Sequence, residues 1–247
     1  GMWLGDEDFL SWGWRVPFLA SALLVGIGLW VRLNIGETPA FRAALEAAPP
    51  PAVPLAKLLR DHWGAVLAGS AGVVACFALF YLSTAFALDV GTRSLGYARE
   101  EFLGLQLGAN CFLALGIVLA AYLSDKSSAR AVLLWGSVAT IAIGFAFGPG
   151  LASGSALLVF LTLSAALLTM GFVYGPLGGW LPTLYPVPVR YSGVSVAFNV
   201  GGILGGAVTP LAAKALSNAG MGGSIGLLLV GAGALTLIGV SLARPAS

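Results

Sequence analysis

The stretch "AVLLWGSVATIAIGFAFGPGLASGSALLVFLTLSAALLTMGFVYGPLG", residues 131–178, decides the fold class because it contains no charged side chain. A helix needs about 20 apolar residues to cross a hydrocarbon core of roughly 30 Å, since each residue advances it by about 1.5 Å. The charge-free run continues to residue 189, so it is long enough for two crossings. Within it, Pro149, Gly150 and Gly154 are typical of a turn and predict a short loop between two helices.

The whole chain has the composition of a membrane protein. Of its 247 residues, 58% are hydrophobic and only 9% are charged, whereas soluble domains average about 25% charged residues. The apolar runs are uninterrupted, without the alternation of apolar and polar residues that a transmembrane barrel shows. We therefore predict an all-α membrane protein with about seven transmembrane helices. The predicted helices cover residues 16–33, 64–88, 102–123, 131–148, 155–178, 193–216 and 224–243.

One long polar segment, residues 34–63, separates the first predicted helix from the other six. Its Pro49–Pro51 run and Pro54 are typical of an extended linker. Because the chain begins with Gly and shows no signal peptide pattern, we expect a fragment of a longer protein. The predicted parts are residues 1–33, an external segment with the last helix of an N-terminal half; residues 34–63, a central cytoplasmic loop; and residues 64–247, a C-terminal six-helix transmembrane domain.

The basic residues predict the orientation, since lysine and arginine are enriched in cytoplasmic loops. With an external chain start, eight basic residues lie inside and four outside, which is a moderate bias. The inner set is Arg32, Arg42, Lys57, Arg60, Lys126, Arg130, Arg190 and Arg244, and the outer set is Arg15, Arg93, Arg99 and Lys214.

Several functions are not supported by the sequence. A net charge of +2 is too small and too dispersed for nucleic acid binding. No phosphate loop or metalloprotease motif is present, and His62, the only histidine, is expected to be an interfacial anchor rather than a catalytic base. Cys76 and Cys111 lie in apolar runs without a second ligand cluster, so we expect buried thiols rather than a disulfide or metal site. We therefore expect no enzyme and no cofactor.

Three stretches together resemble a known family. They are "FLSWGWRVPFLASALLVGIGLWVRLNIGETPAF" (residues 9–41), "YLSDKSSAR" (residues 122–130) and "VYGPLGGWLPTLYPVPVRYSGVSVAFNVGGILGGAVTP" (residues 173–210). They resemble the major facilitator superfamily and, within it, the metabolite:proton symporters that carry proline/betaine, shikimate, 2-oxoglutarate and citrate. The resemblance implies a twelve-helix transporter of the bacterial cytoplasmic membrane. This chain then corresponds to the sixth helix plus the C-terminal six-helix half.

The resemblance also implies a gating loop between the third and fourth predicted helices, which in the family latches the inward side during the access cycle. The loop here departs from the family pattern at Ala121, Ser128 and Ala129. The alternative interpretation of its charges is an orientation signal alone. The gating candidates are Ser124, Asp125, Lys126, Arg130 and Arg190.

Uncharged polar side chains inside the predicted helices are the candidates for substrate binding. Gln106 and Asn110 are four residues apart, so they share a helix face. Such groups can hydrogen-bond a carboxylate or a zwitterion, and the alternative is that they bond neighbouring helices. The substrate-binding candidates are Tyr81, Thr84, Gln106, Asn110, Tyr174 and Asn199.

All ten acidic residues fall in loops or at predicted helix ends. Asp89 is expected to be an interfacial end charge rather than a proton carrier. In proton-coupled relatives the coupling acid lies in the half that this chain lacks, so coupling has no candidate residue here.

Glycines and prolines predict close packing and broken helices. Glycines four residues apart let helix backbones approach, and prolines inside spans kink or break them. The glycine pairs are Gly201 with Gly205, Gly202 with Gly206, Gly171 with Gly175 and Gly104 with Gly108; the prolines are Pro176, Pro182 and Pro210.

These features predict secondary active transport of a small organic acid or zwitterionic metabolite, proton-coupled in the complete protein, by alternating access. Two alternatives stay open: a truncated half that does not transport, and a drug efflux member of the same superfamily. The expected partners are the lipid bilayer, a small-molecule substrate with a proton, and the missing N-terminal half.

Overall fold

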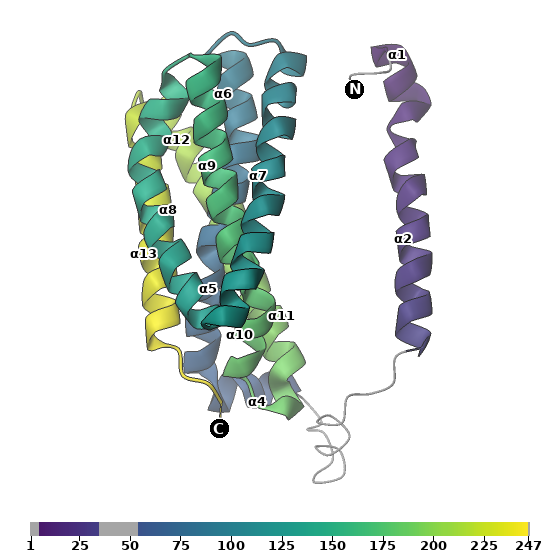
Figure 1. The fold of residues 1–247 in the computed structure, drawn as a ribbon, viewed down its shortest axis with the longest axis vertical. Coiled ribbons are helices and arrows are strands. Elements are labelled where there is room, and N and C mark those ends of the chain that lie inside the picture. The colour runs from purple at the N-terminus through teal and green to yellow at the C-terminus, as the bar shows by residue number, and fades with distance from the viewer. Residues whose placement is uncertain (1–4, 35–53, 247) are drawn as a thin grey trace. The chain divides into compact units, whose positions relative to one another are not determined.

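The computed structural model describes residues 5–34 and 54–246, and the chain divides into two compact units, residues 1–49 and 50–247. Both units are shown in Figure 1. The central part of the predicted linker, with Arg42 and Pro49–Pro51, lies outside the described residues.

The first unit is a single long helix. It contains α1 (Asp6–Asp8), the π-helical turn η1 (Phe9–Gly13) and α2 (Arg15–Asn34). No residue of α2 is buried, and apolar side chains lie all round it. A helix that is apolar on every side is stable only in lipid or against other helices, so this unit confirms the first predicted span.

The second unit is a bundle of long helices (Figure 1). Short π and 3₁₀ segments interrupt several of them. Its elements are α4 (Pro54–Asp61), α5 (Trp63–Tyr81), η2 (Leu82–Phe86), α6 (Ala87–Arg93), α7 (Arg99–Lys126), α8 (Ala129–Ala152), α9 (Ala156–Tyr174), α10 (Leu177–Trp180), η3 (Leu181–Leu184), η4 (Val187–Val189), α11 (Arg190–Ile203), η5 (Leu204–Val208), α12 (Thr209–Asn218), η6 (Gly222–Ser224) and α13 (Gly226–Leu242).

All seven predicted transmembrane helices are confirmed among the described residues, and each is longer than predicted. The candidate spans are Phe9–Asn34, Trp63–Arg93, Arg99–Lys126, Ala129–Ala152, Ala156–Leu184, Val187–Asn218 and Gly222–Leu242. The extra length comes from helix ends that carry charged or small residues, which a search for charge-free runs omits.

Glycines set the spacing between the helices. A Cβ at Gly171 of α9 would collide with the carbonyl of Leu113, and a Cβ at Gly116 of α7 would collide with the carbonyl of Leu168. The two helices therefore pack backbone to backbone. The prediction for Gly171 is confirmed, whereas the one for Gly104 is wrong for the described bundle, because a Cβ there would meet no described atom within 4 Å.

Of the two predicted glycine pairs in α11 and η5, the first makes the expected backbone contact. Gly201 and Gly205 lie against the backbone of α5, at Ser70 and Val74. The second pair, Gly202 and Gly206, instead makes room for the rings of Phe77 and Tyr81.

Two loop predictions need correction. Pro149 and Gly150 do not form the turn, because α8 continues through them to Ala152, and the turn is made at Gly154 with φ of +67°. Proline near a helix end removes only one backbone hydrogen bond, and Gly150 packs directly against Thr162 of α9.

The second correction concerns the linker, because residues 54–61 form α4 instead of an extended segment. Pro54 is the first residue of this helix, where its fixed φ suits the helix and its missing N–H is not needed. Leu58 is fully buried and anchors α4 to the bundle, where α4 packs on α11 and η4.

Four of the bundle's spans contain irregular segments, and in two of these spans the irregular segments lie at or near predicted prolines. The helix α9 ends at Tyr174 just before Pro176, Pro182 lies in the 3₁₀ segment η3, and Pro210 follows the π segment η5. The break at η2 contains no proline, and no sequence signal indicated it.

Candidate transport site

The π segment η2 is the feature around which polar side chains gather. Gln106 of α7 donates from Nε2 to the carbonyl oxygens of Ser83 at 3.0 Å and Thr84 at 2.8 Å. Gln106 is only 6% exposed. Carbonyl groups in an irregular helical turn need donors when water is absent, so Gln106 braces α7 against the break in the α5 span.

Three other predicted residues lie around the same break. Thr84 donates its hydroxyl to the Phe80 carbonyl at 2.6 Å, and Asn110 donates from Nδ2 to the Gln106 carbonyl at 2.9 Å. The Tyr81 ring packs edge-on against Phe80, faces Gly206 and is 38% exposed. The structure therefore brings Gln106 and Thr84 into contact at the break, with Tyr81 and Asn110 about one turn away on their own helices.

Tyr174 and Asn199 lie at a different level of the bundle. The Tyr97 hydroxyl donates to the Gly154 carbonyl at 2.7 Å, so the loops preceding α7 and α9 lie at the same end. At a rise of about 1.5 Å per residue, Gln106 lies about 10 Å from the start of α7, whereas Tyr174 lies about 27 Å from the start of α9. The two residues are therefore at different depths in the bundle. Tyr174 is 44% exposed, and Asn199 is exposed with its amide donating to the Ser195 carbonyl at 2.8 Å.

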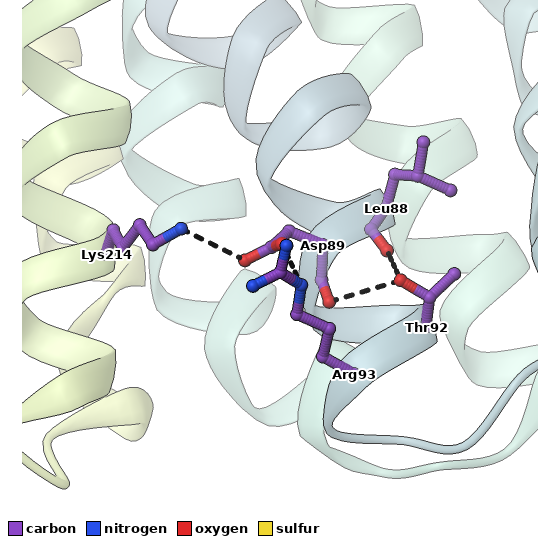
Figure 2. A network of polar contacts seen from close by, with 5 residues as sticks. All are labelled: Leu88, Asp89, Thr92, Arg93 and Lys214. Atoms are coloured by element: carbon purple, nitrogen blue, oxygen red, sulfur yellow. Dashed lines mark hydrogen bonds and ion pairs between the residues drawn. The ribbon is translucent and has the colours of Figure 1, made fainter.

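A charged cluster ties two helices together beyond η2. Asp89 of α6 pairs with Arg93 at 2.8 Å and with Lys214 of α12 at 3.8 Å (Figure 2). The Thr92 hydroxyl donates to the carbonyl oxygens of Leu88 and Asp89 beside it. Asp89 thus has two cationic partners at a helix end, which fits an interfacial end charge.

The opposite end of the bundle carries most of its basic residues and is called here the basic end. At this end lie α4 and the C-terminal end of the chain (Figure 1). The residues that define it are Lys57, Arg60, Lys126, Arg130, Arg190 and Arg244.

The predicted gating residues all lie at the basic end but do not bind one another. Arg130 donates to the carbonyl oxygens of Val240 at 3.2 Å and Ser241 at 2.7 Å, so it caps the C-terminus of α13. Lys126 lies over the Tyr122 ring at 4.4 Å. Asp125 is exposed, and within residues 54–246 it forms no hydrogen bond or ion pair.

The two remaining gating candidates differ in their contacts. Arg190 donates from Nε to the Tyr185 carbonyl at 3.1 Å. The Ser124 hydroxyl is buried and has no hydrogen-bond partner among the described residues.

Tyr185 is a structural residue that the sequence did not single out. Its ring is fully buried between Gly69 of α5 and Gly193 of α11, and its hydroxyl donates to the Ala65 carbonyl at 3.1 Å. Burial raises the pKa of Tyr185 from 10.0 to about 12. The only sequence signal for this role was the position of Tyr185, an aromatic residue with a hydroxyl group directly before Pro186 at a span boundary.

The cysteine prediction is half wrong. Cys76 is buried in α5, whereas Cys111 of α7 is exposed, because its face of the helix does not pack against the bundle. Within the described residues there is no group of three or more His, Cys, Asp or Glu side chains that could hold a metal ion.

Residues 8–210 match the family model of the Major Facilitator Superfamily. The chain belongs to the major facilitator superfamily. It is 39% identical over 246 residues to the inner membrane metabolite transport protein YhjE of Escherichia coli K12, covering 97% of this chain and 56% of that protein. The members of this superfamily are transporters and not enzymes.

Two further relatives are named for their substrates. The shikimate transporter of E. coli K12 is 34% identical over 214 residues, which cover 85% of this chain and 49% of that protein. The proline/betaine transporter of Salmonella typhimurium is 26% identical over 219 residues, which cover 85% of this chain and 44% of that protein. This superfamily member spans about half the length of the curated relatives it matches. Its apolar helices make it a multi-pass membrane protein, and its similarity to YhjE, by name an inner membrane protein, indicates the bacterial inner membrane.

Proposed function

We propose that this chain supplies the C-terminal half of a transporter that takes up a small organic acid or zwitterionic metabolite together with a proton, by alternating access. The observation that carries the proposal is the grouping of Tyr81, Thr84, Gln106 and Asn110 around the break at η2, in a chain that belongs to a transporter superfamily. Broken helices are the usual place for substrate sites in such transporters.

The available groups fit a carboxylate-bearing substrate. The Tyr81 hydroxyl is an uncharged donor, and with the amide of Asn110 it supplies orientation without an unpaired buried charge. The names of the relatives, shikimate and proline/betaine, cover an organic acid and zwitterions and support the same class.

Proton coupling is assigned to the half that this chain lacks. Every acidic residue in the described spans of the bundle lies near a span end, and Asp89 is paired with two cations. An acid in the membrane interior is the usual proton carrier. The N-terminal half is therefore proposed as both the second wall of the cavity and the source of the coupling group.

Uptake by the complete protein tests this proposal. We expect proteoliposomes with the full-length transporter to accumulate radiolabelled shikimate, proline or betaine, and a protonophore to abolish the accumulation. Uptake that is unaffected by collapse of the pH gradient would contradict symport, and outward movement of drugs without metabolite uptake would support efflux instead.

Variants locate the site. We expect Asn110→Leu and Tyr81→Phe to raise the KM several-fold. Thr140→Val is the control, because the Thr140 hydroxyl bonds only the Gly136 carbonyl of its own helix. Residues 1–247 alone should not transport, since half of the cavity wall is absent; robust uptake by them would contradict the two-half arrangement.

A further inference from the structure

A crevice opens between α11 and α13 toward the basic end of the bundle. Both helices pack on α5, which forms its floor, and the crevice has a volume of about 850 Å³. Its body is apolar. The residues that define it are Ala68 and Ala71 on the floor, Val200 and Leu204 on one wall, and Leu235 and Ile238 on the other.

One end of the crevice is polar and carries both signs of charge. Asp61 ends α4, His62 follows it, and Arg244 lies just beyond α13; all three line the crevice. Asp61 and Arg244 are exposed. The ion pairs among the described residues both involve Asp89, so Asp61 and Arg244 are not paired with each other or with another described charge.

We propose that this crevice binds a zwitterionic phospholipid of the phosphatidylethanolamine type. In the membrane an apolar crevice of this kind is filled by hydrocarbon, and its volume falls within the roughly 300–1,000 Å³ of known ligand sites. An acyl chain lies between α11 and α13. The phosphate binds Arg244 with His62 as a second donor, and the ammonium binds Asp61.

The two opposite charges select the headgroup. A phosphate accepts hydrogen bonds from a guanidinium, and a primary ammonium donates to a carboxylate. An anionic phospholipid such as phosphatidylglycerol satisfies Arg244 but leaves Asp61 facing a like charge. None of the six predicted substrate-binding residues lines the crevice, so lipid binding is independent of the proposed transport site.

Native mass spectrometry of the full-length transporter in mild detergent tests the site, with phosphatidylethanolamine or phosphatidylglycerol added. We expect the wild type to retain phosphatidylethanolamine in preference to phosphatidylglycerol. Arg244→Gln and Asp61→Asn should each lower its affinity about fivefold, which corresponds to the loss of about 1 kcal/mol for one juxtamembrane charge. The charge control is Arg99→Gln, an exposed arginine at the other end of the bundle.

A second pair of variants tests the acyl chain. Val200 is 37% exposed in the crevice wall, and Val200→Phe should exclude the chain and reduce lipid retention. Val138 of α8 is 56% exposed and lies outside the crevice, so Val138→Phe is the matched control and should retain lipid.

Three outcomes would overturn the proposal. Unchanged lipid affinity in both Arg244→Gln and Asp61→Asn would contradict the proposed headgroup contacts. If the wild type retained phosphatidylglycerol as well as phosphatidylethanolamine, the proposed selectivity for a zwitterionic headgroup would be wrong. A wild type without lipid would show that another occupant, such as a helix of the N-terminal half, covers the crevice.

Discussion

The hydroxyl of Thr236 accepts a hydrogen bond from the backbone N–H of Ala75 at 3.0 Å, across the interface between α13 and α5. The same hydroxyl donates to the Ala71 carbonyl at 2.8 Å. Ala71 and Ala75 are the partners of one backbone hydrogen bond in a regular α-helix. The side chain of one span thus bridges adjacent turns of another.

Replacement of Thr236 by valine should destabilise the bundle modestly. The valine keeps the shape, and the freed Ala71 and Ala75 groups can pair with each other, so we expect a loss of about 0.6 kcal/mol, the mean for such bonds in membranes. The measurement is equilibrium unfolding of the full-length protein in mixed micelles. Thr140→Val is the matched control, because Thr140 is equally buried but bonds only its own helix.

Gln106→Leu should destabilise the protein by about 1–3 kcal/mol, because the carbonyl groups of Ser83 and Thr84 lose their buried donor. Unfolding in mixed micelles gives this value, and uptake assays on the folded fraction give the KM. If Gln106 mainly stabilises the packing of α7 against η2, the variant has a lower unfolding free energy but an unchanged KM. A large rise in KM at unchanged stability would assign it to substrate contact instead.

Gly171→Ala should be strongly disruptive. Its Cβ would run into the Leu113 carbonyl and force α7 and α9 apart, and overpacking of this kind costs about 1–3 kcal/mol. Gly104→Ala on α7 makes the same chemical change where nothing lies within 4 Å, so it should be neutral or slightly stabilising. Equal stability of the two variants in a thermal shift assay would contradict the packing of α7 on α9.

Tyr185→Phe should cost about 1 kcal/mol at neutral pH, because the hydrogen bond to the Ala65 carbonyl is lost. The pKa of Tyr185 is raised by burial to about 12, so above pH 10.0 the unfolded chain releases this proton before the folded one. The stability that the neutral phenol provides is complete below pH 10.0 and is lost as the pH rises toward 12. The advantage of the wild type over the variant should therefore shrink and then change sign as the pH approaches 12, because a pKa shift of this size outweighs one hydrogen bond. A constant difference would contradict the assignment.

Arg130 and Asp125 should have separable effects. Arg130→Gln removes the cap on α13, and we expect it to lower the unfolding free energy by about 1 kcal/mol. Asp125→Asn should leave stability unchanged, because the described residues give it no partner. If Asp125 belongs to a gate with the N-terminal half, its variant slows transport several-fold; an unchanged rate would leave only an orientation role for this loop.

The sequence by itself determined the number and type of spans, because the cost of placing charge in hydrocarbon makes every crossing a long run without charge. It also indicated the family, through residues 9–41 and 173–210, and the close packing at Gly171 and Gly201. The end of α8 and the start of α4 were not predictable from turn residues, because packing at Gly150 and Leu58 extends the helices beyond the local signals.

Only the tertiary structure decided which polar groups meet. Gln106 and the η2 carbonyl groups are 22 and 23 residues apart, and Thr236 lies 161 residues from Ala75. No local pattern encodes such contacts, since each depends on how two helices turn their faces toward each other. The same holds for the crevice between α11 and α13, whose charges at Asp61 and Arg244 come from opposite ends of the bundle's sequence. Hydrophobicity determines which segments form helices, and the packing of these helices, close where glycines face each other, determines which side chains come into contact.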